Sequence, residues 1–302
     1  MEQFSLAKIF PVQIRSAMQE KNWQEGLEEI RVRVGQPLEF CFDSGNCYLL
    51  PDIRIHMTDI AEMLNYISNY SLYAYQEELR QGYITIEGGH RIGLAGGAVM
   101  EGGAVTGVRH ISFLNVRVAH ERRGCGEELL PYLRNHSGIY HTLIISEPGA
   151  GKTTLLRDCI RLLSDGDETH PGRKVCVVDE RQEIAASHLG VPQNDLGART
   201  DVLDGCTKDQ GMRMLIRSMS PQILAVDELG GRDDFLAVEQ AIYSGSHILG
   251  TIHAGNVREL CEKQGLKHLI EREVFGRYVW IERLPDGRRR MHVYDAHMEK
   301  IR

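Results

Sequence analysis

The sequence predicts an α/β protein in which a domain with a mainly parallel sheet, over residues 137–302, follows a smaller α+β domain over residues 1–136. Two observations lead to this fold class. From residue 141 onward, apolar strand-like segments alternate with segments of helical periodicity, a pattern typical of a parallel sheet with helices on its faces. Before residue 120, strand-like segments instead follow one another with turn residues between them, which favours hairpins.

The composition is that of an ordinary globular protein. Its 302 residues are 42% hydrophobic and 25% charged, which excludes a disordered chain, a collagen-like repeat and a coiled-coil rod. The net charge of −7 gives no general attraction to nucleic acid, which needs clustered cations. No apolar run approaches the ~18 residues of a membrane span, and the N-terminus lacks an apolar signal core, so a cytoplasmic location is expected. The seven cysteines contain no CxxC pair and are expected to be reduced.

The first domain begins with mixed helix and strand signals. Residues 5–21 have a helical apolar pattern, interrupted near Pro11. Residues 27–34 alternate as a strand does, and a second strand at 38–42 leads to a hairpin loop at 43–46.

The rest of the first domain is rich in glycine. A helix is expected to begin at Thr58 and reach Ser68. Eight glycines lie between residues 88 and 107, and we interpret them as hairpin turns because no helix start follows. A strand is predicted at 108–119, and residues 121–136 read as a linker followed by a short helix.

The second domain alternates strand and helix. Strands are predicted at 141–146, 174–179, 222–227 and 247–252, and helices at 151–163, 207–218 and 233–244. Beyond Arg258 the pattern weakens until a final hairpin, 277–284 and 289–295, around Pro285, Asp286 and Gly287.

A phosphate-binding motif follows the first of these strands. The pattern GxxxxGK[ST] fits except at its first position, where Ser146 replaces glycine. A strand precedes the motif and a helix follows, so backbone N–H groups and the helix N-terminus together favour a polyphosphate. Lys152 is expected to reach the β- and γ-phosphates, and Thr153 to ligate Mg²⁺. The predicted nucleotide-binding residues are Ser146, Glu147, Pro148, Gly149, Ala150, Gly151, Lys152, Thr153 and Thr154.

Acidic residues end two further predicted strands, at Asp227-Glu228 and at Asp179-Glu180. Ligands of open α/β sheets bind at the carboxyl ends of strands, so both ends are expected at the phosphate site. Asp227 is predicted to hold Mg²⁺ and Glu228 to activate the attacking water. Glu180 remains open as the alternative base, with Glu228 preferred.

A histidine ends a fourth predicted strand. A single histidine of this kind more often has a structural role than a functional one. The position of His253 at a strand end beside the phosphate site makes a γ-phosphate sensor an equal alternative.

This combination resembles the type II and type IV secretion ATPases. The phosphate-binding motif, the acidic segment VVDERQE, the Asp-Glu pair and the histidine segment GSHILGTIHAG occur in that order over roughly residues 140–256. Longer segments resemble the stage III sporulation protein AA family of endospore-forming bacteria, from about Glu28 to Gly255. They are RVRVGQPLEF, HRIGLAGGAV, VVDERQEIAA, NDLGARTDVLDGC and IRSMSPQILAVDELG.

The resemblance implies a RecA/AAA-like P-loop domain that binds and hydrolyses ATP with Mg²⁺. It implies a homo-oligomer, expected to be a hexameric ring, that powers a secretion-like channel between mother cell and forespore. The protein would be cytoplasmic and bound to the membrane through an integral-membrane channel protein encoded in the same operon. No nucleic-acid partner is expected.

Three positions depart from the pattern of the secretion ATPases. Ser146 replaces the first glycine of the phosphate-binding motif. The histidine segment of those enzymes usually has a histidine directly after its glycine, whereas Ser246 follows Gly245 here and only His253 matches. Those enzymes also often have glycine at the position of Asp227.

A ring ATPase usually needs an arginine delivered across a subunit interface, which contributes ~10³-fold or more in rate. We select Arg217 as the catalytic candidate, with Arg199 second. Arg181 and Arg213 are further candidates for this arginine, and a solvated basic stripe is an equal alternative for each of the four. Arg91 and Arg117 of the first domain are candidates to close over the nucleotide.

Two alternatives to an ATP-driven motor stay open. One is a nucleic-acid-dependent ATPase on the same core, for which Arg288, Arg289 and Arg290 would supply a basic hairpin tip. The other is a scaffold that is gated by nucleotide and has negligible turnover, against which the intact Asp227-Glu228 pair argues.

Overall fold

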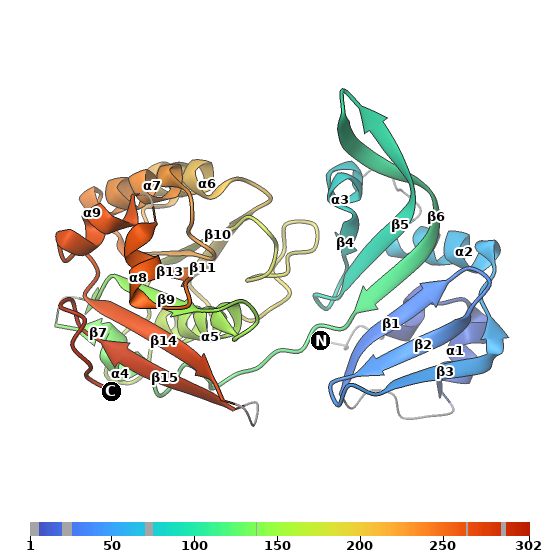
Figure 1. Cartoon of the computed structure of the whole chain (residues 1–302), viewed down its shortest axis with the longest axis horizontal. Helices are drawn as coiled ribbons and strands as arrows, with labels where there is room; N and C mark the ends of the chain where they lie inside the picture. Colours follow the sequence, from blue (N-terminus) through green and yellow to red (C-terminus); the bar gives the residue numbers. More distant parts are fainter. Residues whose placement is uncertain (1–5, 20–25, 70–74, 137, 264, 285–287) are drawn as a thin grey trace. The chain divides into compact units, whose positions relative to one another are not determined.

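The computed structural model describes residues 6–19, 26–69, 75–136, 138–263, 265–284 and 288–302 (Figure 1). The chain divides into two compact units, residues 1–120 and 121–302. Residues 121–136, which the sequence analysis placed with the first domain, therefore make their contacts within the second unit. The predicted turn at 285–287 lies outside the described residues.

The first unit is a six-stranded antiparallel sheet with the strand order β3-β2-β1-β6-β5-β4. The alternating residues Ile30, Val32, Leu38 and Phe40 point to its buried face, as the strand periodicity predicts. The glycine-rich segment forms the β5–β6 hairpin, which confirms the prediction of hairpins. The elements are a 3₁₀ helix (Leu6–Ile9), α1 (Val12–Gln19), β1 (Leu27–Arg33), β2 (Pro37–Phe42), β3 (Cys47–Arg54), α2 (Met57–Ile67), α3 (Gln76–Gln81), β4 (Tyr83–Thr85), β5 (Arg91–Glu101) and β6 (Ala104–Arg117).

The second unit has a seven-stranded sheet with the order β11-β10-β12-β13-β9-β14-β15. Its neighbouring strands are parallel except at the last pair, β14 and β15. An α/β fold is thus confirmed for this unit. The strands are β9 (Thr142–Ser146), β10 (Val175–Asp179), β11 (Thr200–Asp204), β12 (Ile223–Val226), β13 (His247–His253), β14 (Arg277–Arg283) and β15 (Arg289–Tyr294).

The helices of this unit are α4 (Leu130–Leu133), α5 (Lys152–Asp165), α6 (Lys208–Met219), α7 (Arg232–Tyr243), α8 (Val257–Glu262) and α9 (Leu266–Glu271), and a short ribbon joins β7 (Arg134–Asn135) to β8 (Gly138–Ile139). The sequence did not predict β11, α8 and α9. These elements are short, β11 is largely half-buried, and most of α8 and half of α9 are exposed, so their apolar periodicity is weak. No helix among the described residues is both long enough and apolar enough to cross a membrane.

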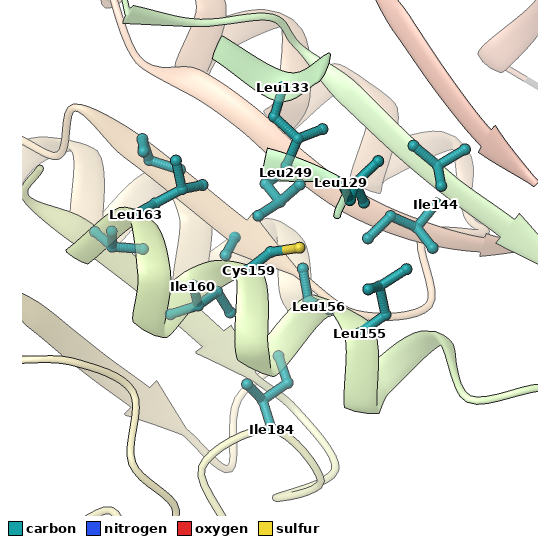
Figure 2. Close-up of a cluster of buried hydrophobic side chains, with 14 of the residues drawn as sticks. Leu129, Leu133, Ile144, Leu155, Leu156, Cys159, Ile160, Leu163, Ile184 and Leu249 are labelled. Atoms are coloured by element: carbon teal, nitrogen blue, oxygen red, sulfur yellow. The ribbon is translucent and has the colours of Figure 1, made fainter. Parts of the chain in front are cut away.

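Helix α5 fixes the phosphate-binding loop to the sheet. Its residues Leu155, Leu156, Cys159, Ile160 and Leu163 form one buried stripe in a cluster that also contains strand residues of β9 and β13 (Figure 2). Each fully buried leucine or isoleucine contributes roughly 1.5–3 kcal/mol. The helix N-terminus is therefore held where β9 ends.

Candidate functional site

The carboxyl ends of parallel strands bring the predicted residues together at one edge of the sheet. β13 lies between β9 and β12, and its last residue, His253, is the register partner of Ser146 at the end of β9. β12 ends at Val226, immediately before Asp227. His253 therefore lies between the phosphate-binding loop and the acidic pair.

The loop between β9 and α5 depends on two glycines with left-handed backbone. Gly149 has φ +74° and Gly151 has φ +96°, a region that side chains other than glycine rarely adopt. Gly151 is the N-cap of α5, so the helix begins at Lys152. The first N–H groups of α5 have no partner within the helix and are available to an anion.

Lys152 is buried, with 4% of its surface exposed. Its ammonium donates to the carbonyls of Ser146 (3.1 Å) and Glu147 (3.0 Å), to the Ser146 hydroxyl (3.1 Å) and to Nδ1 of His253 (2.9 Å). Burial lowers the pKa of Lys152, and the carboxylates of Asp227 and Glu228 act in the opposite direction. These neutral acceptors hold the cation in the loop, where phosphate oxygens could replace them.

Thr153 and Asp227 form an oxygen-rich pair. The Thr153 hydroxyl donates to Oδ2 of Asp227 at 2.6 Å. The other carboxylate oxygen of Asp227 accepts from the Thr251 hydroxyl and from the backbone N–H of Glu228 (3.1 Å). Hydroxyl and carboxylate oxygens are the ligands that Mg²⁺ prefers, so these residues fit the predicted magnesium site.

Glu228 is held by two donors. The Lys152 ammonium donates to Nδ1 of His253, so Nε2 carries the ring proton and donates to Oε1 of Glu228 at 2.8 Å. The Arg181 guanidinium donates to the other carboxylate oxygen. Burial raises the pKa of Glu228, but the His253 and Arg181 donors outweigh it and leave this pKa below its usual value.

The backbone of Glu228 is strained. Its φ of +54° is uncommon for a residue with a side chain and costs about 1–3 kcal/mol. The Glu228 N–H donates to the Thr251 hydroxyl at 2.8 Å, which stabilises this conformation. Strain of this kind is concentrated at functional positions in proteins.

Other predicted residues lie outside this group or have structural partners. Glu180 pairs with Lys208, the first residue of α6. Arg217 is exposed in the last turn of α6, about 14 Å along the helix from Lys208 at 1.5 Å per residue. Arg199 donates to the backbone carbonyls of Ser164 (3.2 Å) and Asp165 (3.4 Å) at the end of α5.

Asp179, at the end of β10, also has a structural role. Its carboxylate accepts from the N–H groups of Glu183 (2.9 Å), Ile184 (3.1 Å) and Ala185 (2.8 Å), and it thereby fixes the loop that carries Arg181. Burial raises the pKa of Asp179, and the nearby Asp227 carboxylate raises it further. The three backbone donors act in the opposite direction.

Sequence reasoning missed the roles of Thr251 and of Arg181 as a partner of Glu228. Arg181 was considered only as one of several arginines that act between subunits. Thr251 lies two residues before His253 on the same strand, and its side chain reaches Asp227 only because β12 and β13 are neighbours. The sequence signal from which the role of Thr251 could have been predicted is this polar residue near the end of an otherwise apolar strand, in Thr251-Ile252-His253.

This fold is shared by solved structures, among them an ATPase and a pilus retraction motor. The ATPase DotB of Legionella pneumophila superposes with a TM-score of 0.60 at 16% identity, over 93% of this chain and 79% of that one. The pilus retraction motor PilT, solved with bound ADP, gives 0.62 at 14% identity, over 96% of this chain and 82% of that one.

The sequence comparison identifies the family. The model of the family described as "Sporulation stage III, protein AA" matches residues 2–301. Stage III sporulation protein AA of Bacillus subtilis (strain 168) is 40% identical over 293 residues, which are 96% of this chain and 94% of that protein. The chain belongs to the sporulation stage III protein AA family, and the resemblance seen in the sequence is confirmed.

Proposed function

We propose that this protein is a Mg²⁺-dependent ATPase in which Glu228 activates water and His253 reports the γ-phosphate to it. One observation carries the proposal: Lys152, His253 and Glu228 form a continuous hydrogen-bonded line beside the Thr153–Asp227 pair. The line holds a cation that can bind phosphate and a carboxylate that can accept a proton at one site, and triphosphate hydrolysis uses both kinds of group.

In the proposed mechanism, ATP binding changes the hydrogen bonds of Lys152 and His253 before water is activated. In the ATP complex the Lys152 ammonium exchanges its bonds to Ser146, Glu147 and His253 for phosphate oxygens. His253 then loses a donor at Nδ1, so that nitrogen can accept from water or from a protonated phosphate oxygen. Glu228 orients the attacking water and accepts its proton. Mg²⁺, held by Thr153 and Asp227, would neutralise charge on the β- and γ-phosphates.

The family and the fold support a wider proposal about cellular role. The ATPase acts from the cytoplasm as a hexameric ring, docked on an integral-membrane sporulation protein of the same operon, and powers a secretion-like channel between mother cell and forespore. Arg217 lies at the end of α6 away from Glu180 and Lys208, so its catalytic role requires contact with a neighbouring subunit's nucleotide.

The first experiment compares ATP turnover of the wild type with Lys152→Ala and Glu228→Gln. Loss of Lys152 is expected to abolish nucleotide binding, whereas Glu228→Gln is expected to bind ATP and lower kcat at least 10²-fold. Lys267→Ala and Glu271→Gln, exposed on α9, serve as matched controls. Light scattering with and without ATP measures assembly. Unchanged turnover in Glu228→Gln would contradict the proposal.

The scaffold alternative keeps one supporting observation, because the Arg181 and His253 donors occupy both oxygens of Glu228. Wild-type protein that binds ATP and assembles but has the turnover of Glu228→Gln would favour it. The nucleic-acid alternative loses support, since Arg289 packs against Gly151 of the phosphate-binding loop and is not a free basic tip.

A further inference from the structure

A cavity of about 260 Å³ opens beside the phosphate-binding loop, within the second unit. Gly151 and Leu155 line it from the start of α5, and Ile281 and Met291 from the β14–β15 hairpin. Cys125 lines it from the segment that precedes α4. None of these residues apart from Gly151 takes part in the site described above.

The lining of this cavity combines apolar residues with two charged ones, Glu128 and Arg289. Leu155 is 5% and Ile281 4% exposed, and Met291 packs against the same core cluster. The volume is slightly below the roughly 300 Å³ at which pockets for drug-sized ligands begin, so the cavity suits one planar heterocycle. The apolar walls can bury its faces.

Arg289, on β15, lines the cavity and also lies against the phosphate-binding loop. A Cβ built on Gly151 would lie 2.6 Å from the guanidinium carbon of Arg289, so the guanidinium packs directly on the loop backbone. The planar guanidinium can stack on an aromatic ring and attract its π-face. A ligand that ran from the loop into the cavity would lie beside this group.

A nucleoside triphosphate has an anionic end that fits the loop and an apolar planar end that fits the cavity, and Arg289 lies close to both. We propose that the cavity is the base-binding subsite of this chain, with Arg289 stacked on the base and Ile281 and Met291 beneath it. This inference rests on the proposed function. It specifies where the base of the nucleotide binds, which the phosphate-binding motif does not determine.

The test separates base binding from phosphate binding. Calorimetry measures the affinity of the full-length protein for Mg²⁺·ATP and for Mg²⁺ with inorganic tripolyphosphate, which has no base. Because a stacked guanidinium attracts the π-face of a base, Arg289→Gln is expected to weaken ATP binding roughly tenfold and to leave tripolyphosphate binding unchanged. Met291→Gln, close in volume to the wild type, is expected to do the same.

Arg290→Gln is the matched control, because successive strand residues point to opposite faces and Arg290 is also exposed. Equal weakening of both ligands by Arg289→Gln would assign Arg289 to the phosphates and overturn the inference. Unchanged ATP affinity in both cavity variants would also overturn it while leaving the phosphate site intact. A wild type that binds neither ligand would instead refute the proposed function.

The Cys125 thiol gives a second readout that needs no variant. ATP whose base occupies the cavity is expected to slow alkylation of Cys125 by a maleimide, whereas tripolyphosphate is expected to leave the rate unchanged. Mass spectrometry of the peptide that contains Cys125 measures the alkylation. Cys47, exposed in the other unit, is the internal reference. Equal protection of Cys125 by both ligands would contradict a base in this cavity.

Discussion

At the scale of single residues, the site depends on how each charge is partnered. Glu228 combines a strained backbone with two donors, and its strain is offset by the bond from its N–H to Thr251. Lys152 is buried among neutral acceptors and has carboxylates nearby. In the proposed ATPase, such an arrangement would hold these groups in place before ATP binds and limit their reorganisation during hydrolysis.

The Arg181–Glu228 pair gives a prediction about pH. Glu228 must be ionised to accept a proton, and Arg181 is one of the two donors that lower its pKa. Arg181→Gln removes that donor, so the pKa of Glu228 rises. As the pH is lowered, ATP turnover of the variant is therefore expected to decline at a higher pH than turnover of the wild type. The profile of kcat against pH measures this. An acid limb that does not move relative to Arg258→Gln, an exposed control on α8, would contradict the assignment.

At the scale of elements, helices and strands are fixed by close contacts that tolerate little added volume. Gly211 in α6 faces β10, and a Cβ there would lie 2.6 Å from Cγ1 of Val178 and 2.8 Å from the sulfur of Cys206. These contacts allow α6 to approach the sheet, and Lys208 in its first turn to reach Glu180.

Gly211→Ala therefore tests two opposing effects. Alanine is favoured over glycine in a helix by about 1 kcal/mol, but overpacking of a core costs typically 1–3 kcal/mol. The clash is with a buried strand, so we expect overpacking to dominate and the free energy of unfolding to fall by ~1 kcal/mol. Urea unfolding followed by circular dichroism measures it. Gln210→Ala, exposed on the same helix, should be neutral or slightly stabilising.

The β2–β3 hairpin presents a second prediction at this scale. Cys41 and Cys47 are register partners, and the Phe42 N–H donates to the Asn46 carbonyl, so the cysteines form the adjacent non-hydrogen-bonded pair. Such pairs have Cα atoms ~4.5 Å apart, within the range of a disulfide. The two sulfurs are 2.9 Å apart as thiols.

A low-molecular-weight disulfide is therefore expected to oxidise this pair selectively. The two protein thiols become one disulfide, and the reagent is reduced to two thiols. Burial and the neighbouring Cys47 raise the pKa of Cys41 to about 11, so attack by the Cys41 thiolate accelerates as pH rises. Mass spectrometry should find a Cys41–Cys47 cross-link, which Cys47→Ser abolishes. Equal oxidation of Cys206 and Cys261 would contradict selectivity.

At the scale of the whole molecule, the chain contains two units with separate cores. Among the residues that the structure describes, the buried cluster of the first unit contains none from the second, and the two clusters of the second unit contain none from the first. Leu129, Leu130 and Leu133 belong to the core of the second unit, although they precede β9.

This division predicts that residues 121–302 fold without the first unit. A fragment of residues 137–302, which follows the sequence-based boundary, lacks three buried leucines that contribute roughly 1.5–3 kcal/mol each. Its free energy of unfolding is expected to be lower by ~5 kcal/mol or more, measured by urea unfolding of both fragments. Equal stability of the two would place the boundary at residue 137.

The sequence by itself determined the class of fold, the phosphate-binding motif and the family. These features are local, since strand and helix periodicity and the spacing from Gly149 to Thr153 depend on neighbouring residues. It also placed Asp227, Glu228 and His253 at strand ends. The parallel-sheet rule then predicted that they would meet.

Only the tertiary structure decided which of these groups are in contact. The insertion of β13 between β9 and β12 joins Lys152 to Glu228 through His253, and the loop after β10 brings Arg181 to Glu228. Arg289 reaches Gly151 from a hairpin more than a hundred residues away in sequence. Strand order and hairpin packing arise from burial of distant apolar surfaces, and no local pattern encodes them.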